Sequence, residues 1–150
     1  MTDNALGTTT VVQVGIVVRD IEAVARAWAD LLGVPVPEIE ITDGLDRAHT
    51  EYNGGPSVAR AKLAFLHLGQ VDLELIEPIG EPSTWKDRLD AHGEGLHHIA
   101  FRVQGMAERL RNLETGGATL VQRGDYEGGR YAYVDATATL GTILELLEND

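Results

Sequence analysis

The sequence lacks cysteine, which excludes a disulfide framework, a thiolate zinc site and a thiol nucleophile. It is also poor in basic residues, with 12 Lys and Arg against 24 Asp and Glu, and its formal net charge is -12. Such an acidic surface repels phosphate backbones, and the basic residues are scattered along the chain. We therefore expect no nucleic-acid partner.

Long apolar runs are also missing. No run approaches the roughly 18 residues that a membrane span needs, so we expect no membrane segment. The first ten residues, MTDNALGTTT, have neither the basic start nor the apolar run of a signal peptide. Together with the lack of cysteine, this indicates a cytoplasmic protein. The 150 residues are 43% hydrophobic, which is enough for one compact domain with a buried core.

What the sequence does contain is an internal repeat. The segment QVGIVV from Gln13 lies over HIAFRV from His98, and LELIEP from Leu73 lies over LELLEN from Leu144. Each first strand is followed by an amphipathic helix, over 21–32 in the first half and from Met106 in the second. Further strands are predicted near 38–42, 61–68, 71–78, 118–123, 129–135 and 142–147. Each half therefore reads β-α-β-β-β.

The repeat predicts an α+β protein of two modules, at about 11–78 and 96–148, joined by a linker over 79–95. In the linker, Pro82 and Ser83 open a short helix that carries Trp85 and Leu89. The polar stretch 43–60 has no periodicity, so we expect it to be unstructured and to cover a substrate.

Strand alternation assigns the polar residues to faces. Gln13 and His98 point away from the helices at equivalent positions, whereas His97 points to the helix side as a core histidine. Glu74 and Glu145 form a second equivalent pair, and Glu145 has apolar neighbours on its strand, where a carboxylate is costly unless compensated. Two carboxylates, an imidazole and an amide oxygen are suitable ligands for a divalent metal.

At these residues the sequence resembles the vicinal oxygen chelate superfamily, the glyoxalase and bleomycin-resistance fold, from about Val11 to Glu148. The resemblance implies that the paired β-α-β-β-β modules curl into a cupped mixed sheet with a metal at its bottom. It also implies a homodimer. The ligands, taken from the first and last strands of each module, are Gln13, Glu74, His98 and Glu145. The metal would be cobalt, manganese, nickel or zinc.

Within the superfamily the chain looks most like methylmalonyl-CoA epimerases, in the segments VGIVVRDIEAV, KLAFLHLG, LELIEPIGEPSTW, GEGLHHIAFRV and GTILELLE. This implies a small-molecule substrate, an acyl-CoA thioester or a similar carboxylated compound. A base removes a proton next to a carbonyl, and the metal stabilises the enolate. Glu74 and Glu145 are the catalytic candidates. Arg102 is a candidate to pair with a substrate carboxylate, and Tyr131 and Tyr133 are candidates to line the cup.

The exact reaction stays open between alternatives. Epimerases usually have histidine where this chain has Gln13, and a Gln, Glu, His, Glu set resembles that of some glyoxalase I lyases. Glyoxalase I normally shows a DPDGY-like segment before its last glutamate, where this chain has VDATATLG from Val134 to Gly141. A non-catalytic protein that sequesters a small molecule in the same cup is a further alternative.

Overall fold

The structure is a computed structural model in which residues 4–150 are described. Its strands are β1 (Val11–Val17), β2 (Glu40–Ile41), β3 (Glu51–Tyr52), β4 (Gly55–Pro56), β5 (Arg60–Leu68), β6 (Val71–Ile79), β7 (Gly95–Arg102), β8 (Thr119–Tyr126), β9 (Gly129–Asp135) and β10 (Ile143–Asn149). Its helices are α1 (Ile21–Leu32), α2 (Leu45–Ala48), α3 (Thr84–His92), α4 (Met106–Thr115) and α5 (Thr137–Leu140).

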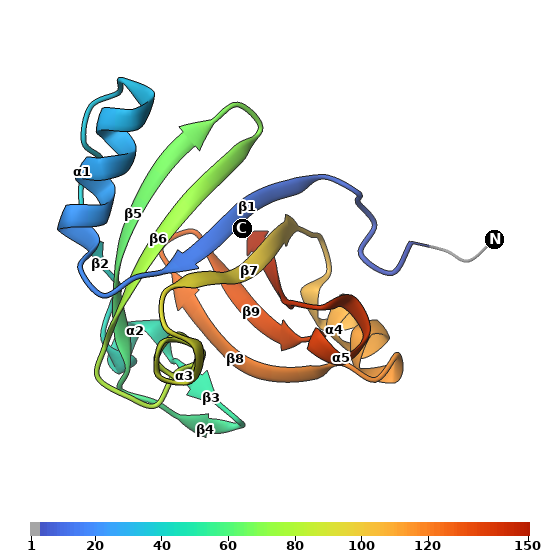
Figure 1. The fold of residues 1–150 in the computed structure, drawn as a ribbon. Coiled ribbons are helices and arrows are strands. Elements are labelled where there is room, and N and C mark those ends of the chain that lie inside the picture. The colour runs from blue at the N-terminus through green and yellow to red at the C-terminus, as the bar shows by residue number, and fades with distance from the viewer. Residues whose placement is uncertain (1–3) are drawn as a thin grey trace.

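All ten strands form one curled sheet in the order β2-β5-β6-β1-β7-β10-β9-β8-β3-β4. β1 runs parallel to β6, β7 runs parallel to β10, and β1 and β7 are antiparallel neighbours. The first and last long strands of both halves therefore lie together in the middle of the sheet (Figure 1). This is the α+β architecture with a curled mixed sheet that the sequence predicts. The exact module boundaries stay a prediction.

The predicted first helix is confirmed over its full range. Asp20 caps α1 by accepting a hydrogen bond from the Ala23 backbone N–H, and Gly33 ends the helix in the left-handed conformation. Ile21 and Ala25 are buried on the side that faces the sheet. The helix is fixed to the outer face of β5 and β6, where it lies at the left of Figure 1.

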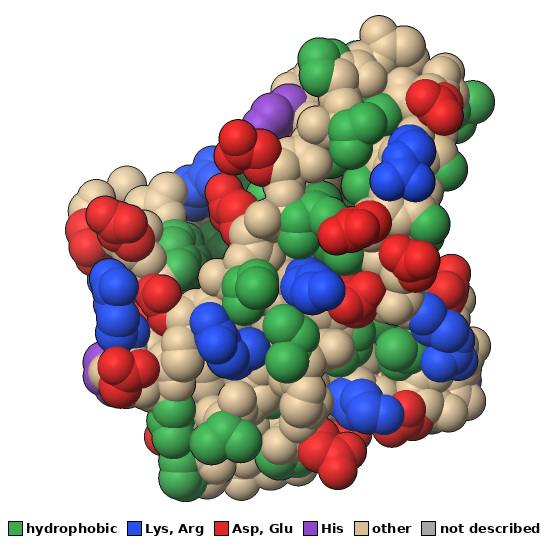
Figure 2. Space-filling view, turned by 90° about the vertical axis from the view of Figure 1, so that its left-hand side faces the viewer, with side chains coloured by type: hydrophobic (Ala, Val, Ile, Leu, Met, Phe, Trp, Pro, Cys, Tyr) green, Lys and Arg blue, Asp and Glu red, His purple; other side chains and the backbone are tan. Residues whose placement is uncertain are grey.

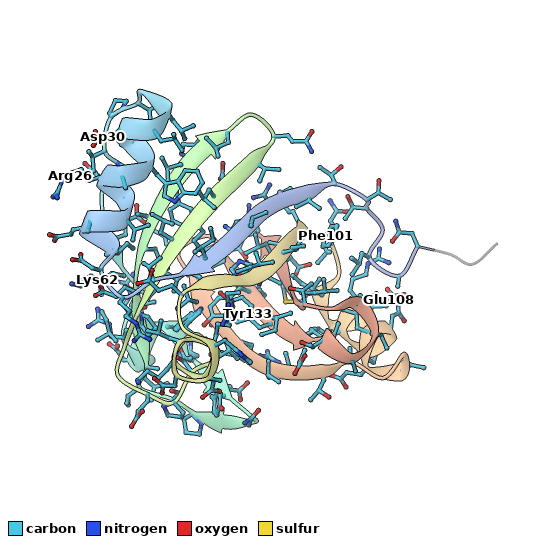
Figure 3. The ribbon with its side chains drawn as sticks, in the orientation of Figure 1. Arg26, Asp30, Lys62, Phe101, Glu108 and Tyr133 are labelled. Carbon is cyan, nitrogen blue, oxygen red and sulfur yellow. The ribbon has the colours of Figure 1, made fainter. Side chains whose placement is uncertain are left out.

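The core has three parts. α1 packs on the outer face of the first half and α4 on the outer face of the second half. The third part lies inside the curl, where Trp85 and Leu89 of α3 contact Val17 and Tyr133. Figure 3 shows Tyr133 in the space enclosed by the sheet, whereas Arg26 of α1 points outward. The concave side therefore holds an apolar layer of its own beside the polar residues.

The stretch predicted to be unstructured is ordered, and that prediction is wrong. Residues 42–59, here called the strap, contain α2, β3 and β4. β2, just before the strap, pairs with β5 at one edge of the sheet, and β3 pairs with β8 at the other. Four strap side chains are buried, those of Ala48, Thr50, Ser57 and Ala59. The strap thus crosses between the two edges of the curled sheet.

The face that carries α1 has a mixed surface. In Figure 2 the basic side chains of that face lie singly among acidic and apolar ones. Within residues 4–150, no helix is both long and apolar enough to cross a membrane.

Candidate metal centre

Four strands bring the predicted ligands together in the middle of the sheet. Gln13 lies on β1, Glu74 on β6, His98 on β7 and Glu145 on β10. Gly15 of β1 pairs with Glu74 on one side and with His98 on the other. Because the four strands are neighbours, residues far apart in the chain meet at one level of the concave face.

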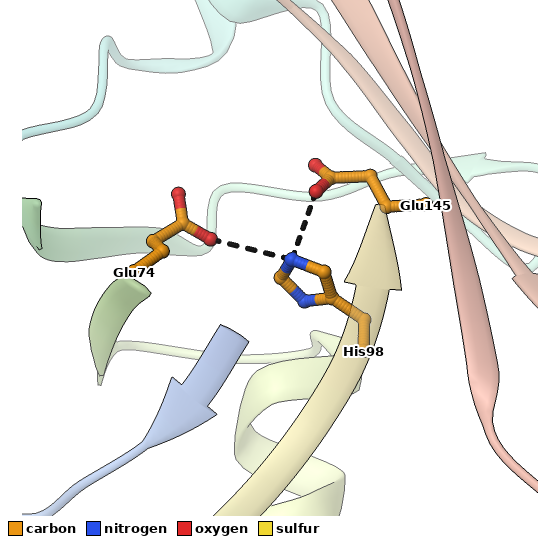
Figure 4. Close-up of side chains that lie close together, drawn as sticks. All are labelled: Glu74, His98 and Glu145. Carbon is orange, nitrogen blue, oxygen red and sulfur yellow. Dashed lines mark ion pairs between the residues drawn. The ribbon is translucent and has the colours of Figure 1, made fainter. Parts of the chain in front are cut away.

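The side chains converge on the Nε2 atom of His98. The distances from Nε2 are 2.8 Å to Glu145 Oε2, 2.9 Å to Gln13 Oε1 and 3.5 Å to Glu74 Oε1. Figure 4 shows Glu74 and Glu145 approaching the imidazole from two sides. The exposed fractions of Gln13, Glu74, His98 and Glu145 are 8%, 6%, 0% and 4%. Glu74, His98 and Glu145 each offer a ligand atom, and these atoms lie within 4.8 Å of one another.

The cluster is incompletely satisfied by the described residues alone. Glu74 Oε1 and Glu145 Oε2 are buried, and within residues 4–150 neither has a hydrogen-bond partner, although Glu145 Oε2 lies within ion-pair distance of His98. A single Nε2–H could serve only one of the three surrounding oxygens, and an unpaired buried carboxylate is costly. A divalent cation would satisfy every one of these atoms, so the donor set fits a metal.

The electrostatics of Glu74 agree with that fit. Burial raises the pKa of its carboxyl well above the ordinary value, and the charges of Glu145 and Asp72 raise the pKa further. Without a compensating cation, the site therefore favours a protonated Glu74.

The position of His97 differs from the predicted one. Gly15 pairs with His98 and the next residue of β1, Ile16, pairs with Leu96, which makes His97 the extra residue of a β-bulge. The bulge breaks strict alternation, so both imidazoles contact Tyr133, with ring centroids 4.9 Å and 5.1 Å from its ring. His97 is a buried, hydrogen-bonded core histidine as predicted, but it does not lie on the opposite face from His98.

Gly15 makes room for the His98 ring, a role that its sequence position alone did not indicate. A Cβ atom built on Gly15 would lie 2.1 Å from His98 Cε1, which is far inside contact distance. The equivalent position in the second half is Ala100, which keeps its methyl group. The His98 ring therefore occupies space that only a glycine at position 15 leaves free.

The two tyrosines of β9 line the concave side next to the cluster. The Tyr133 hydroxyl accepts a hydrogen bond from Trp85 Nε1 at 3.0 Å, and the Tyr131 hydroxyl accepts one from Gln122 Nε2 at 3.0 Å. Burial, followed by the charge of Glu145, raises the pKa of the Tyr133 phenol, and burial is also the main cause that raises the pKa of Tyr131. Both phenols are therefore neutral hydrogen-bonding groups.

Arg102 lies apart from the four ligands. It is the last residue of β7, it is exposed, and its register partner on β10 is Leu147. It borders a cavity of about 360 Å³ together with Thr8, Val12 and Arg109.

The sequence analysis missed Thr84 and Gln122, which form hydrogen bonds on the concave side and belong to no recognisable motif.

Comparisons with known proteins identify the family. Residues 12–134 match the Glyoxalase/Bleomycin resistance protein/Dioxygenase superfamily model. YqjC of Bacillus subtilis (strain 168), described as uncharacterized, is 35% identical over 92 residues, which is 59% of this chain and 66% of YqjC. An ethylmalonyl-CoA/methylmalonyl-CoA epimerase of Cereibacter sphaeroides is 26% identical over 121 residues, covering 79% of this chain and 78% of that protein.

A solved structure shares the fold. Methylmalonyl-CoA epimerase from Mycobacterium tuberculosis superposes with a TM-score of 0.66 at 22% identity, covering 100% of this chain and 93% of that one. The family match spans most of the chain, including Gln13, Glu74 and His98. The chain belongs to the Glyoxalase/Bleomycin resistance protein/Dioxygenase superfamily.

Proposed function

We propose that this protein is a metal-dependent epimerase or isomerase that acts on an acyl-CoA thioester or a similar small carboxylated substrate. The observation that carries the proposal is the buried cluster of two carboxylates, an imidazole and an amide oxygen on four neighbouring strands. The similarity to two epimerases supports the choice of reaction.

Gln13, Glu74, His98 and Glu145 would hold the metal. Their three oxygens and one nitrogen suit cobalt, manganese, nickel or zinc. When bound, such an ion supplies Lewis-acid chemistry, because its charge stabilises the negative charge that develops on a carbonyl oxygen beside a deprotonated carbon.

Glu74 and Glu145 are the proposed proton carriers. Epimerisation needs one group near each face of the reacting carbon, so that a proton is removed on one side and returned on the other. The two carboxylates approach His98 from two sides (Figure 4). Both carboxylates are buried, so a proton on either one is shielded from exchange with bulk water.

Other side chains would bind and orient the substrate. Tyr131 and Tyr133 give the concave side neutral phenol groups that hydrogen bonds hold in place. Arg102 is exposed at the end of β7 and is our candidate partner for a substrate carboxylate.

The test is hydrogen exchange at the reacting carbon. Metal-loaded protein is incubated with methylmalonyl-CoA in D₂O, and deuterium at the carbon between the carbonyls is measured by mass spectrometry. We expect the parent protein to incorporate deuterium into the substrate. The Glu145→Gln variant should lose this activity, and the exposed control Glu127→Gln should keep it. Binding of the acyl-CoA without hydrogen exchange above background would instead identify a sequestering protein.

A homodimer stays a prediction, which analytical ultracentrifugation checks.

The ligand set favours one second candidate, a glyoxalase I-type lyase. An amide oxygen and two carboxylates surround the single imidazole here, whereas a second histidine is usual at the position of Gln13 in epimerases. A hemithioacetal of methylglyoxal with a thiol is the discriminating substrate. Its conversion to the thioester, with no exchange in methylmalonyl-CoA, would replace the epimerase by the lyase.

A further inference from the structure

The bulge in β7 gives the metal ligand His98 an unusual neighbour. Consecutive side chains of a regular strand point to opposite faces and do not bond to each other. Here the extra residue His97 brings its Nδ1 atom to 2.9 Å from the Nδ1 atom of His98, with the rings nearly perpendicular. On its other side His97 Nε2 lies 3.1 Å from Thr84 Oγ1, in the first turn of α3.

A metal at His98 determines which atoms donate and which accept in the hydrogen bonds that link His98, His97 and Thr84. His98 Nε2 faces the three oxygen ligands, so a metal there requires the Nε2 lone pair and leaves the proton on Nδ1. That Nδ1–H meets His97 Nδ1, which must then accept. His97 in turn carries its own proton on Nε2 and donates it to Thr84 Oγ1.

The reverse order is incompatible with a metal. If His97 donated from Nδ1, His98 would accept at Nδ1 and carry its proton on Nε2, directed at the three oxygens. The direction of both hydrogen bonds therefore depends on a single acceptor atom, His97 Nδ1. His97 is only 3% exposed, and its two ring nitrogens face His98 Nδ1 and Thr84 Oγ1, so the ring can accept at Nδ1 while it donates from Nε2.

We propose that His97 is a positioning residue of the metal centre: it accepts the Nδ1–H of His98, holds the Nε2 lone pair toward the metal, and is itself oriented by Thr84. The inference rests on the proposed metal centre. A histidine ligand whose other ring nitrogen donates to a fixed acceptor binds metal more tightly, and loss of that acceptor typically costs about 10- to 100-fold in affinity.

The internal repeat indicates which substitution at His97 is best suited to test this role. β1 contains a bulge at Val12, the residue before Gln13, which corresponds to His97 before His98. His97→Val therefore copies the bulge residue of the first half into the second. His97→Asn keeps an acceptor oxygen near the place of Nδ1, and the exposed His67→Val is the control.

The experiment measures Co²⁺ affinity by chelator competition, and histidine tautomers of the Zn²⁺-loaded parent by ¹⁵N NMR. We expect His97→Val to bind at least about 10-fold more weakly, while His97→Asn and His67→Val stay within about threefold of the parent. The NMR spectrum should place a proton on His98 Nδ1 and another on His97 Nε2.

Two results would overturn the inference while leaving the metal centre intact. One is a His97→Val protein that binds Co²⁺ as tightly as the parent. The other is a loaded parent whose His97 proton lies on Nδ1, and this result decides the matter even if His97→Val does not fold. A parent that binds neither metal would instead contradict the proposed function, and the inference with it.

Discussion

The two halves of the molecule supply their proposed metal ligands from equivalent positions but surround them differently. In each half a β-bulge precedes the first ligand, at Val12 before Gln13 and at His97 before His98. The second bulge residue hydrogen-bonds to its ligand, whereas valine has no group that could do so. Strand equivalence thus places the four polar side chains, whereas only the second half places a hydrogen-bonding residue directly before its first candidate ligand.

A second difference lies in how the halves are closed. Between its helix and its next long strand, the first half has the strap, which crosses to the edge of the second half at β8. The second half joins α4 to β8 through only residues 116–118. The segment that crosses between the two edges of the sheet therefore comes from the first half alone.

The largest expected effect is a difference in metal affinity between variants of His98 and Gln13, the first proposed ligand of each half. We expect His98→Ala to lower the affinity for Co²⁺ by more than about 100-fold, because it removes the only nitrogen ligand and its support. Gln13→Ala should cost roughly tenfold, because a neutral amide oxygen is the weaker donor. Chelator competition measures both. Equal losses would mean that the halves contribute equally.

The next effect concerns the equivalent small residues of β1 and β7. Gly15→Ala places a methyl group 2.1 Å from His98 Cε1, so we expect about 1–3 kcal/mol of destabilisation together with weakened metal binding. The reciprocal change Ala100→Gly should cost only about 0.5–1 kcal/mol and leave metal affinity unchanged. Urea unfolding and metal titration of the two variants check this. Unchanged metal binding in Gly15→Ala would show that His98 does not depend on the open space.

The carboxyl of the first half should give the metal-free protein a distinct pH dependence. The folded pKa of Glu74 is raised above its unfolded value, so its contribution to stability is complete below about pH 4.5 and is lost as pH rises through the folded pKa. The buried His97, whose pKa is lowered, acts in the opposite direction below pH 6.5.

Comparison with Glu74→Gln isolates the carboxyl. The difference in unfolding free energy between parent and variant should change with pH by at most about 1.4 kcal/mol per unit, with the parent losing stability relative to the variant as pH rises. Urea unfolding at several pH values between 5 and 8 measures this difference. A constant difference would mean that Glu74 is ionised without a metal.

The smallest effect concerns the strap. The Tyr52 hydroxyl donates a hydrogen bond to Asp87 of α3, and Glu51 forms an exposed ion pair with Arg123 of β8. Tyr52→Phe should cost no more than about 1 kcal/mol but should raise amide hydrogen exchange within residues 42–59. The control Tyr126→Phe, which breaks a bond to Asn149, should leave exchange in the strap unchanged.

The sequence predicted the four candidate ligands better than it predicted the structure around them. Two equivalent polar pairs on apolar strands were enough to select Gln13, Glu74, His98 and Glu145, because burial of polar groups on a repeat is visible in the pattern. The bulge at His97 was not visible, because alternation assumes a regular strand. The strap was missed because elements of two to four residues carry no periodicity.

The most direct test of the account is whether one divalent metal occupies the four-residue cluster. The protein is purified without added metal, its metal content is measured by mass spectrometry, and the measurement is repeated on Glu145→Ala. We predict close to one cobalt, manganese, nickel or zinc ion per chain in the parent and almost none in the variant. A folded parent that holds no metal, even after incubation with each of the four, would contradict the account.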